Sequence, residues 1–211
     1  MPITALVLII SLTLDSAGQP TAPREPRATA KEPWTFSLIT DGYIVPNEVA
    51  YANPNFTADH KWLHLEARYN YENLRSGSLW VGYNFDAGKN LVFHATPMIG
   101  GVFGRTNGIA PGCQASLTYK KLELSLSNEY VFDTGDRSSN FYYAWPQLTY
   151  SPVDWLHIGL AAQQTKVYQT AVDTQRGFFL GLSLKNTTFT TYIFNPGWTT
   201  PTVVLELGLD F

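Results

Sequence analysis

The chain has 211 residues, of which 15% are charged and 14% aromatic, and its formal net charge is −3. An ordinary soluble domain has about 25% charged residues, so this composition indicates a surface that contacts less water than usual. The absence of a basic cluster excludes a nucleic-acid partner, and the single cysteine, Cys113, excludes an internal disulfide.

The first predicted element is a signal peptide over residues 1–18. An apolar run over 5–14 is too short for a bilayer core, which needs about 20 apolar residues, but it has the length of a secretory h-region. Ser16 and Gly18 are the small residues expected before a cut at Gln19. Because no Lys or Arg precedes the run, the alternatives are a true start further upstream and an ordinary apolar strand.

Residues 19–33 are predicted to form a flexible tail. Four prolines lie there among alanine, threonine and charged residues, and such a segment cannot bury enough apolar surface to fold. The folded domain is therefore expected to occupy residues 34–211.

From residue 34 onward the sequence alternates polar and apolar residues in short runs between turn residues, without a helical period. This pattern predicts an all-β domain of about twelve strands, with ten as the alternative count. The first hairpin is the least defined, because Pro46 and Pro54 cannot donate to a strand ladder. The expected strands are 34–45, 50–58, 61–71, 77–85, 90–103, 111–119, 122–132, 140–151, 154–165, 175–185, 188–195 and 202–211.

The connections between these strands fall into two alternating series. Tight turns are expected near 59–60, 86–88, 120–121, 152–154 and 186–187. Longer connections are expected near 46–49, 72–76, 104–110, 133–139, 166–174 and 196–201. One end of the sheet should therefore carry tight turns and the other end longer loops.

The two faces of the expected strands differ in composition. One face is aliphatic, and the other mixes polar residues with many glycines. A soluble surface seldom has so many strand glycines, whereas small residues let the interior of a barrel pack, so the polar face is predicted to line a lumen. A soluble sandwich or lipocalin-like barrel is the alternative. Aromatic residues near strand ends are predicted to lie at the membrane interface: Tyr69, Tyr71, Phe85, Tyr119, Tyr130, Tyr150 and Phe211.

The last strand, Thr202 to Phe211, alternates strictly and ends on an aromatic residue. It resembles the C-terminal signal of bacterial outer-membrane β-barrels of Gram-negative cells, and the two series of connections match the asymmetry of that class. The resemblance implies a closed antiparallel up-and-down transmembrane β-barrel of the small porin-like class. It also implies an outer-membrane location, contact with outer-membrane lipid, and assembly by the barrel-assembly machinery through 202–211.

Charged residues on the inner face are the candidates for a constriction. Arg68 follows Glu66 by two positions, so both side chains share a face. Glu129, Glu206 and Asp41 are the candidates to share this arginine. It could be clamped by carboxylates or could sort solutes by charge. Five aromatic residues are also predicted to point inward: Trp62, Trp80, Tyr143, Trp145 and Phe179. The constriction candidates are Asp41, His64, Glu66, Arg68, His94, Glu129 and Glu206.

The favoured function is passive passage of small solutes through a narrow polar lumen, without a cofactor. A non-conducting barrel with a structural or interaction role is the alternative from another class, and the oligomeric state is left open. A lipid hydrolase is a third hypothesis, since barrel hydrolases resemble one another in a His and a Ser two apart on one strand. No His here has that partner; His94 with Thr96 is the nearest approach. No spacing supplies three metal ligands, so no metal site is predicted.

Overall fold

The computed structural model describes residues 33–197 and 199–211. The predicted signal peptide, and the predicted tail except for Pro33, lie outside these residues. Among the described residues no helix is long and apolar enough to cross a membrane. The elements are β1 (Thr35–Ile44), β2 (Tyr51–His60), β3 (Leu63–Tyr69), β4 (Ser76–Tyr83), β5 (Phe85–Ala87), β6 (Leu91–Gly104), β7 (Gly108–Tyr119), β8 (Leu122–Asp133), the 3₁₀ turn η1 (Arg137–Ser139), β9 (Phe141–Val153), β10 (Leu156–Val167), β11 (Asp173–Leu184), β12 (Thr187–Phe194) and β13 (Thr202–Asp210).

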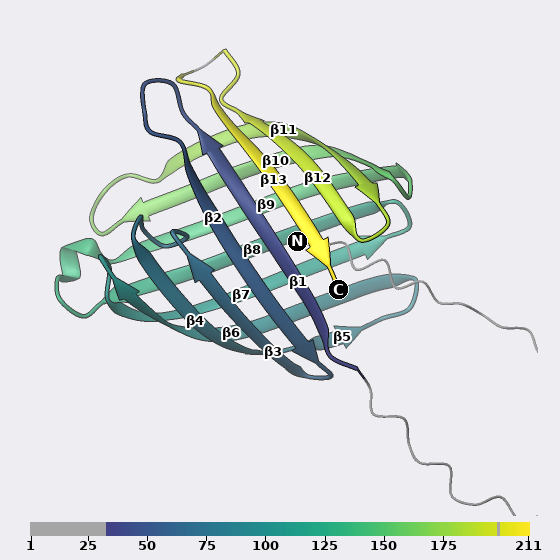
Figure 1. Cartoon of the computed structure of the whole chain (residues 1–211), viewed down its shortest axis with the longest axis horizontal. Helices are drawn as coiled ribbons and strands as arrows, with labels where there is room; N and C mark the ends of the chain where they lie inside the picture. Colours follow the sequence, from purple (N-terminus) through teal and green to yellow (C-terminus); the bar gives the residue numbers. More distant parts are fainter. Residues whose placement is uncertain (1–32, 198) are drawn as a thin grey trace, which may run out of the picture.

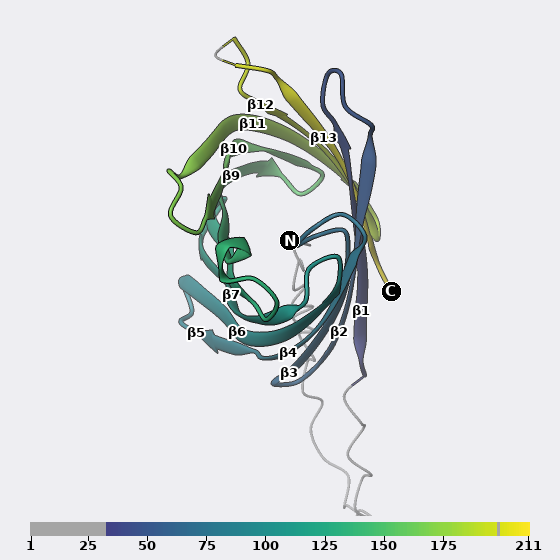
Figure 2. The same cartoon turned by 90° about the vertical axis from the view of Figure 1, so that its left-hand side faces the viewer.

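The strands close into one antiparallel barrel. Strands adjacent in sequence pair with each other, except that β4 and β5 both pair with β6. β1 pairs with β13, so the sheet has no free edge. Seen nearly along its length, the barrel is a ring of tilted strands (Figure 2). Closure satisfies the backbone polar groups of every strand, which is what a barrel in lipid requires.

Two of the thirteen strands, β4 and β5, together form one strand of the barrel. Gly82 of β4 lies opposite Met98, and Phe85 of β5 lies opposite Ala95, so the register with β6 continues unchanged across the gap. Pro97 lies in this interval of β6, and it has no N–H to donate to the ladder. The barrel therefore has twelve strands with β5 as an extension of β4, which confirms the predicted count.

The first hairpin has the predicted limits within a few residues. Tyr43 lies opposite Tyr51, and Pro54 lies opposite Thr40 in the β1–β2 ladder. The ladder between β2 and β3 begins only at Asn55, so Pro54 lies just beyond it and no bond to β3 is lost there.

The two ends of the barrel differ as expected (Figure 1). The start of β1, the C-terminus and the tight turns share one end, while the longer connections, such as 45–50, 134–140 and 195–201, lie at the other. Phe36 and Phe211 exchange two backbone hydrogen bonds of 2.9 and 3.0 Å at the tight-turn end. The last residue of the chain thus completes the β1–β13 ladder.

The aliphatic face lies outside and the polar face lies inside. Leu79 and Leu160 are each 61% exposed on the outer surface, whereas Trp80 and Phe179 are 3% and 5% exposed inside. Trp62 does not point inward as predicted. It lies in the turn after Lys61, whose φ of 57° ends the strand alternation, and it stacks on Tyr83 outside the lumen with ring centroids 5.7 Å apart.

Candidate lumen site

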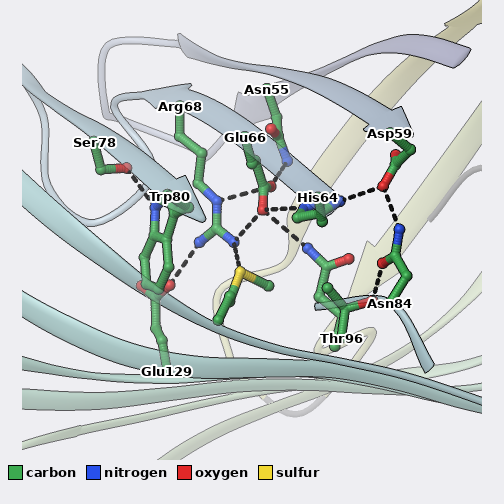
Figure 3. A network of polar contacts seen from close by, with 12 residues as sticks. Asn55, Asp59, His64, Glu66, Arg68, Ser78, Trp80, Asn84, Thr96 and Glu129 are labelled. Carbon is green, nitrogen blue, oxygen red and sulfur yellow. Dashed lines mark hydrogen bonds and ion pairs between the residues drawn. The ribbon is translucent and has the colours of Figure 1, made fainter. Parts of the chain in front are cut away.

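Arg68 is the centre of a charged cluster inside the barrel (Figure 3). Its Nε and Nη2 donate to the two oxygens of Glu66 at 2.9 and 3.0 Å, and its Nη1 donates to Glu129 Oε2 at 2.6 Å. Glu66 and Arg68 share a face because they are two residues apart on β3. Side-chain exposures are 4% or less for all three residues, so the cluster is a buried, charge-assisted network.

Aromatic rings enclose the guanidinium of Arg68. Its Cζ lies 4.4 Å from the ring centroids of both Tyr71 and Trp80, a separation typical of cation–π contacts. Glu72 contributes a third carboxylate, with Oε1 3.7 Å from Nη1. Ser78 donates to Glu72 at 2.6 Å and receives a bond from Trp80 Nε1 at 2.9 Å. The arginine is therefore held on several sides and cannot turn freely.

The position of Tyr71 differs from the prediction. Period two would place it outside with Tyr69, at the membrane interface. The strand ends at Tyr69, however, and Asn70 has a φ of 60°, which reverses the direction of the next side chain. Tyr71 consequently points into the lumen over Arg68.

A chain of polar contacts runs from Glu66 toward the tight-turn end. Glu66 Oε2 lies 3.3 Å from His64 Nε2, and His64 Nδ1 lies 2.8 Å from Asp59 Oδ1. Asn84 donates to the same Asp59 oxygen at 2.7 Å and receives a bond from Thr96 at 2.7 Å. The predicted lumen residue His94 lies at the far end of this chain, 3.0 Å from Thr96.

Asp41 and Glu206 stand apart from this network. They were predicted with Glu129 as candidates to share Arg68, and of these three only Glu129 bonds to the arginine. Asp41 on β1 lies directly opposite Glu206 on β13, and the two are 7% and 8% exposed. Tyr192 donates to Glu206 at 3.1 Å.

The space inside the barrel narrows from one end to the middle. A vestibule of about 750 Å³ at the longer-loop end is bordered by Tyr43, Tyr51, Tyr71 and Tyr143 among others. Below it a cavity of about 70 Å³ is bordered by Arg68 and its partners, and a further cavity of about 40 Å³ lies beside His157. Packed side chains fill much of the remaining interior: Tyr43, Trp145, Ala161, Phe179, Tyr192, Phe194 and Val204.

The nearest approach to a hydrolase has the order of a catalytic triad. His94 Nδ1 lies 2.8 Å from Asp86, and its Nε2 lies 3.0 Å from Thr96. Thr96, however, donates a hydrogen bond to Asn84 Oδ1 and is 1% exposed, so its hydroxyl cannot reach a lipid ester. The arrangement therefore has the order of a triad without an accessible hydroxyl.

A second histidine with hydroxyl partners was missed at the sequence level. His157 lies 2.9 Å from Ser151 and 2.9 Å from Ser183, which lie on the two neighbouring strands. A search for Ser two residues along the same strand cannot find such partners. Both ring nitrogens bond to hydroxyl groups, which leaves neither nitrogen to be oriented by a carboxylate, as a triad requires.

The remaining aromatic candidates lie on the outer surface. Tyr69, Phe85, Tyr119, Tyr150 and Phe211 are between 43% and 64% exposed. Tyr130 is partly buried against Phe132, with ring centroids 4.6 Å apart. These residues lie toward the two ends of the barrel, where amphipathic rings suit the boundary between lipid and water.

No protein-family model matches the chain, and no curated protein sequence matches it. Solved structures are similar in fold. A KdgM porin superimposes with a TM-score of 0.56 at 14% identity, over 83% of this chain and 98% of the porin. The KdgM porin in complex with disordered oligogalacturonate gives 0.56 at 15% identity over the same shares. A structure from a study of in-meso crystallization of membrane proteins gives 0.57 at 8% identity, over 84% and 83% of the two chains. The resemblance to small porin-like barrels is thus confirmed at the level of the fold.

Proposed function

We propose that this chain is an outer-membrane channel for small cationic or neutral polar solutes. The observation that carries the proposal is that two spaces inside a porin-type barrel adjoin at one residue. Tyr71 borders both the vestibule of about 750 Å³ and the cavity beside Arg68. A solute entering from the longer-loop end would therefore meet the Arg68 cluster as its constriction.

The outer surface supports a membrane location. The exposed aliphatic residues of β4, β8 and β10 face outward, and rings lie near both ends of the barrel. Such a band is matched to lipid and would be unfavourable in water. The signal peptide predicted over 1–18 would direct export, and the strand 202–211 would be read by the barrel-assembly machinery.

The charges of the lumen indicate which solutes pass. Among the described residues, buried acidic side chains outnumber buried arginines and lysines: the one buried arginine is Arg68, and the acidic residues are Asp41, Glu66, Glu72, Glu129 and Glu206. An acidic wall attracts cations and repels anions. The similar KdgM porin was solved with oligogalacturonate, which is an acidic sugar polymer. The excess of carboxylates here argues against a solute of that charge.

Single-channel recording in a planar bilayer tests the proposal. We expect discrete conductance steps with a preference for cations over anions. Glu66→Gln should weaken that preference and Arg68→Gln should strengthen it, because each removes one charge from the constriction. Asp154→Asn and Lys185→Gln are matched controls, since both residues are exposed at tight turns outside the lumen.

A non-conducting barrel is the second candidate function. The packed aromatic cluster that includes Trp145 and Tyr192 leaves only small cavities in the middle of the lumen. Such a plug would suit a structural or interaction role. Absence of conductance from protein that inserts and shows heat-modifiable β-structure would exclude the channel and favour this role.

A further inference from the structure

Two carboxylates that face each other in the lumen repel each other when both are charged, unless a positive group lies between them. Asp41 and Glu206 occupy the same level of the β1–β13 ladder, and both are more than nine-tenths buried. Directly opposed residues have Cβ atoms about 4.5–5.5 Å apart, and like charges at that separation destabilise the pair. Burial strengthens the repulsion because little water screens it.

The described residues do not supply this positive group. Arg68 borders the same cavity, but its donors are directed to Glu66 and Glu129. Asp41 Oδ1 is buried and has no hydrogen-bond partner within residues 33–197 and 199–211. An acceptor of this kind, nine-tenths buried and bordering a cavity, indicates a missing donor or cation.

The cavity beside the pair has room and ligands for an ion. It measures about 70 Å³ and is bordered by Asp41, Glu206, Ser127, Gln147 and Trp145. Trp145 Nε1 is likewise buried without a partner among the described residues. A hydrated cation would satisfy both groups at once, because the ion attracts Asp41 and a water bound to the ion accepts from the indole N–H.

We propose that this cavity is a binding site for one singly charged cation, either an alkali-metal ion or a primary ammonium group. The carboxylates of Asp41 and Glu206 supply the charge, and the side-chain oxygens of Gln147 and Ser127 supply neutral ligands. A water occupies about 10–15 Å³ of such space, so the cavity holds a compact ion with a few waters and excludes a sugar.

The ligand set favours single over double charge. Calcium takes six to eight oxygen ligands, usually with several carboxylates. Among the described residues no group of three or more His, Cys, Asp and Glu side chains is arranged to hold a metal ion. Two opposed carboxylates therefore suit a weakly held monovalent ion, which can also leave again.

The inference deepens the proposed function, on which it rests, by naming where a cation pauses in the lumen. Its test measures binding instead of conduction. The thermal unfolding midpoint of the folded protein in detergent is followed while choline chloride is replaced by sodium chloride, or by methylammonium chloride, at constant ionic strength. We expect the wild-type midpoint to rise saturably, by about 3–6 °C at ten times the dissociation constant.

The Asp41→Asn variant should lose most of this rise in the unfolding midpoint. If Asp41→Asn does not fold, Glu206→Gln replaces it in the test, with the same expected result. The exposed Asp154→Asn should keep the full rise. A response to sodium alone would identify a metal ion, and a response to methylammonium alone would identify an ammonium-bearing solute; both support the site. Equal wild-type midpoints in all three salts, or a full rise in Asp41→Asn, would overturn it.

These measurements test the cation site and the channel separately. A cation-specific rise without conductance would retain the site and reject the channel. Conductance without a cation-specific rise would retain the channel and reject the site.

Discussion

Arg68 Nη1 on β3 lies 2.6 Å from Glu129 Oε2 on β8, so one ion pair joins two strands that are 61 residues apart in sequence. Both side chains are nearly inaccessible to water. In such a setting the pair adds modestly to stability when intact, but the loss of one partner leaves the other charge buried and unpaired. The cluster therefore both narrows the lumen and fixes the relative positions of its walls.

Loss of the arginine should destabilise the barrel strongly. Arg68→Met is expected to lower the free energy of unfolding by about 3–5 kcal/mol, because three buried carboxylates lose their cation. Urea unfolding in lipid vesicles measures the effect. Arg105→Met is the matched control, since Arg105 is exposed in the loop 105–107 and its loss should change little.

The coupling between Arg68 and Glu129 can be isolated with a double-mutant cycle. Glu129→Gln alone should be milder than Arg68→Met, because Arg68 keeps both bonds to Glu66. The double variant should be less destabilised than the sum of the single changes, since the two residues are in direct contact. Strict additivity would show that the 2.6 Å contact contributes no energy.

Much of the fold could be predicted from the sequence because a barrel obeys period two. Each of the twelve predicted strands corresponds to one strand of the barrel, and the aliphatic face lies outside. The two wrong predictions of side-chain direction occur where the backbone departs from the alternation of a strand. Lys61 and Asn70 have left-handed φ values, and each redirects the residue that follows, Trp62 and Tyr71. Lysine and asparagine both occur inside strands as well, so residue type alone did not reveal these two strand ends.

The sequence predicted which side chains of the site face the lumen, but not which of them contact one another. Alternation correctly placed Glu66 and Arg68 together on the inner side, yet it could not choose among Asp41, Glu129 and Glu206 as the partner. That choice depends on the distances across the closed barrel, which only the complete register determines. The same reason explains why the hydroxyl partners of His157 were missed, since both lie on other strands.

Gly100 should be irreplaceable beside Trp80, whereas its neighbour should tolerate substitution. A Cβ atom on Gly100 would lie 2.4–2.7 Å from the Trp80 indole ring, and a Cβ atom on Gly101 would meet nothing within 4 Å. Gly100→Ala is expected to lower the free energy of unfolding by about 1–3 kcal/mol, because the added methyl group overpacks the site. Gly101→Ala should leave the free energy of unfolding unchanged. Urea unfolding of the pair distinguishes a packing effect from general glycine flexibility, which would affect both variants alike.

The terminal Phe211 should matter more for assembly than for stability. Its ring lies 6.1 Å from Phe36 and 6.4 Å from Phe56, so Phe211→Ala should lower stability by about 1–3 kcal/mol. If the assembly machinery reads this residue, the amount of folded barrel in the outer membrane of cells should fall further than this loss explains. Phe178→Ala, an outward ring on β11, is the control. Equal amounts of both variants in the membrane would refute recognition of the last residue.

If the barrel conducts as proposed, Tyr71 should limit its conductance, because the Tyr71 ring borders both the vestibule and the cavity at Arg68. Tyr71→Ala removes the phenol ring from the passage between them, and the conductance of single channels should rise as a result. Tyr69→Ala is a matched control, since Tyr69 is two residues away, 49% exposed and directed outward. An unchanged conductance in Tyr71→Ala would place the narrowest point elsewhere, at the aromatic cluster around Trp145. A rise confined to Tyr71→Ala would show that the residue turned inward after the left-handed Asn70 acts as the gate between vestibule and constriction.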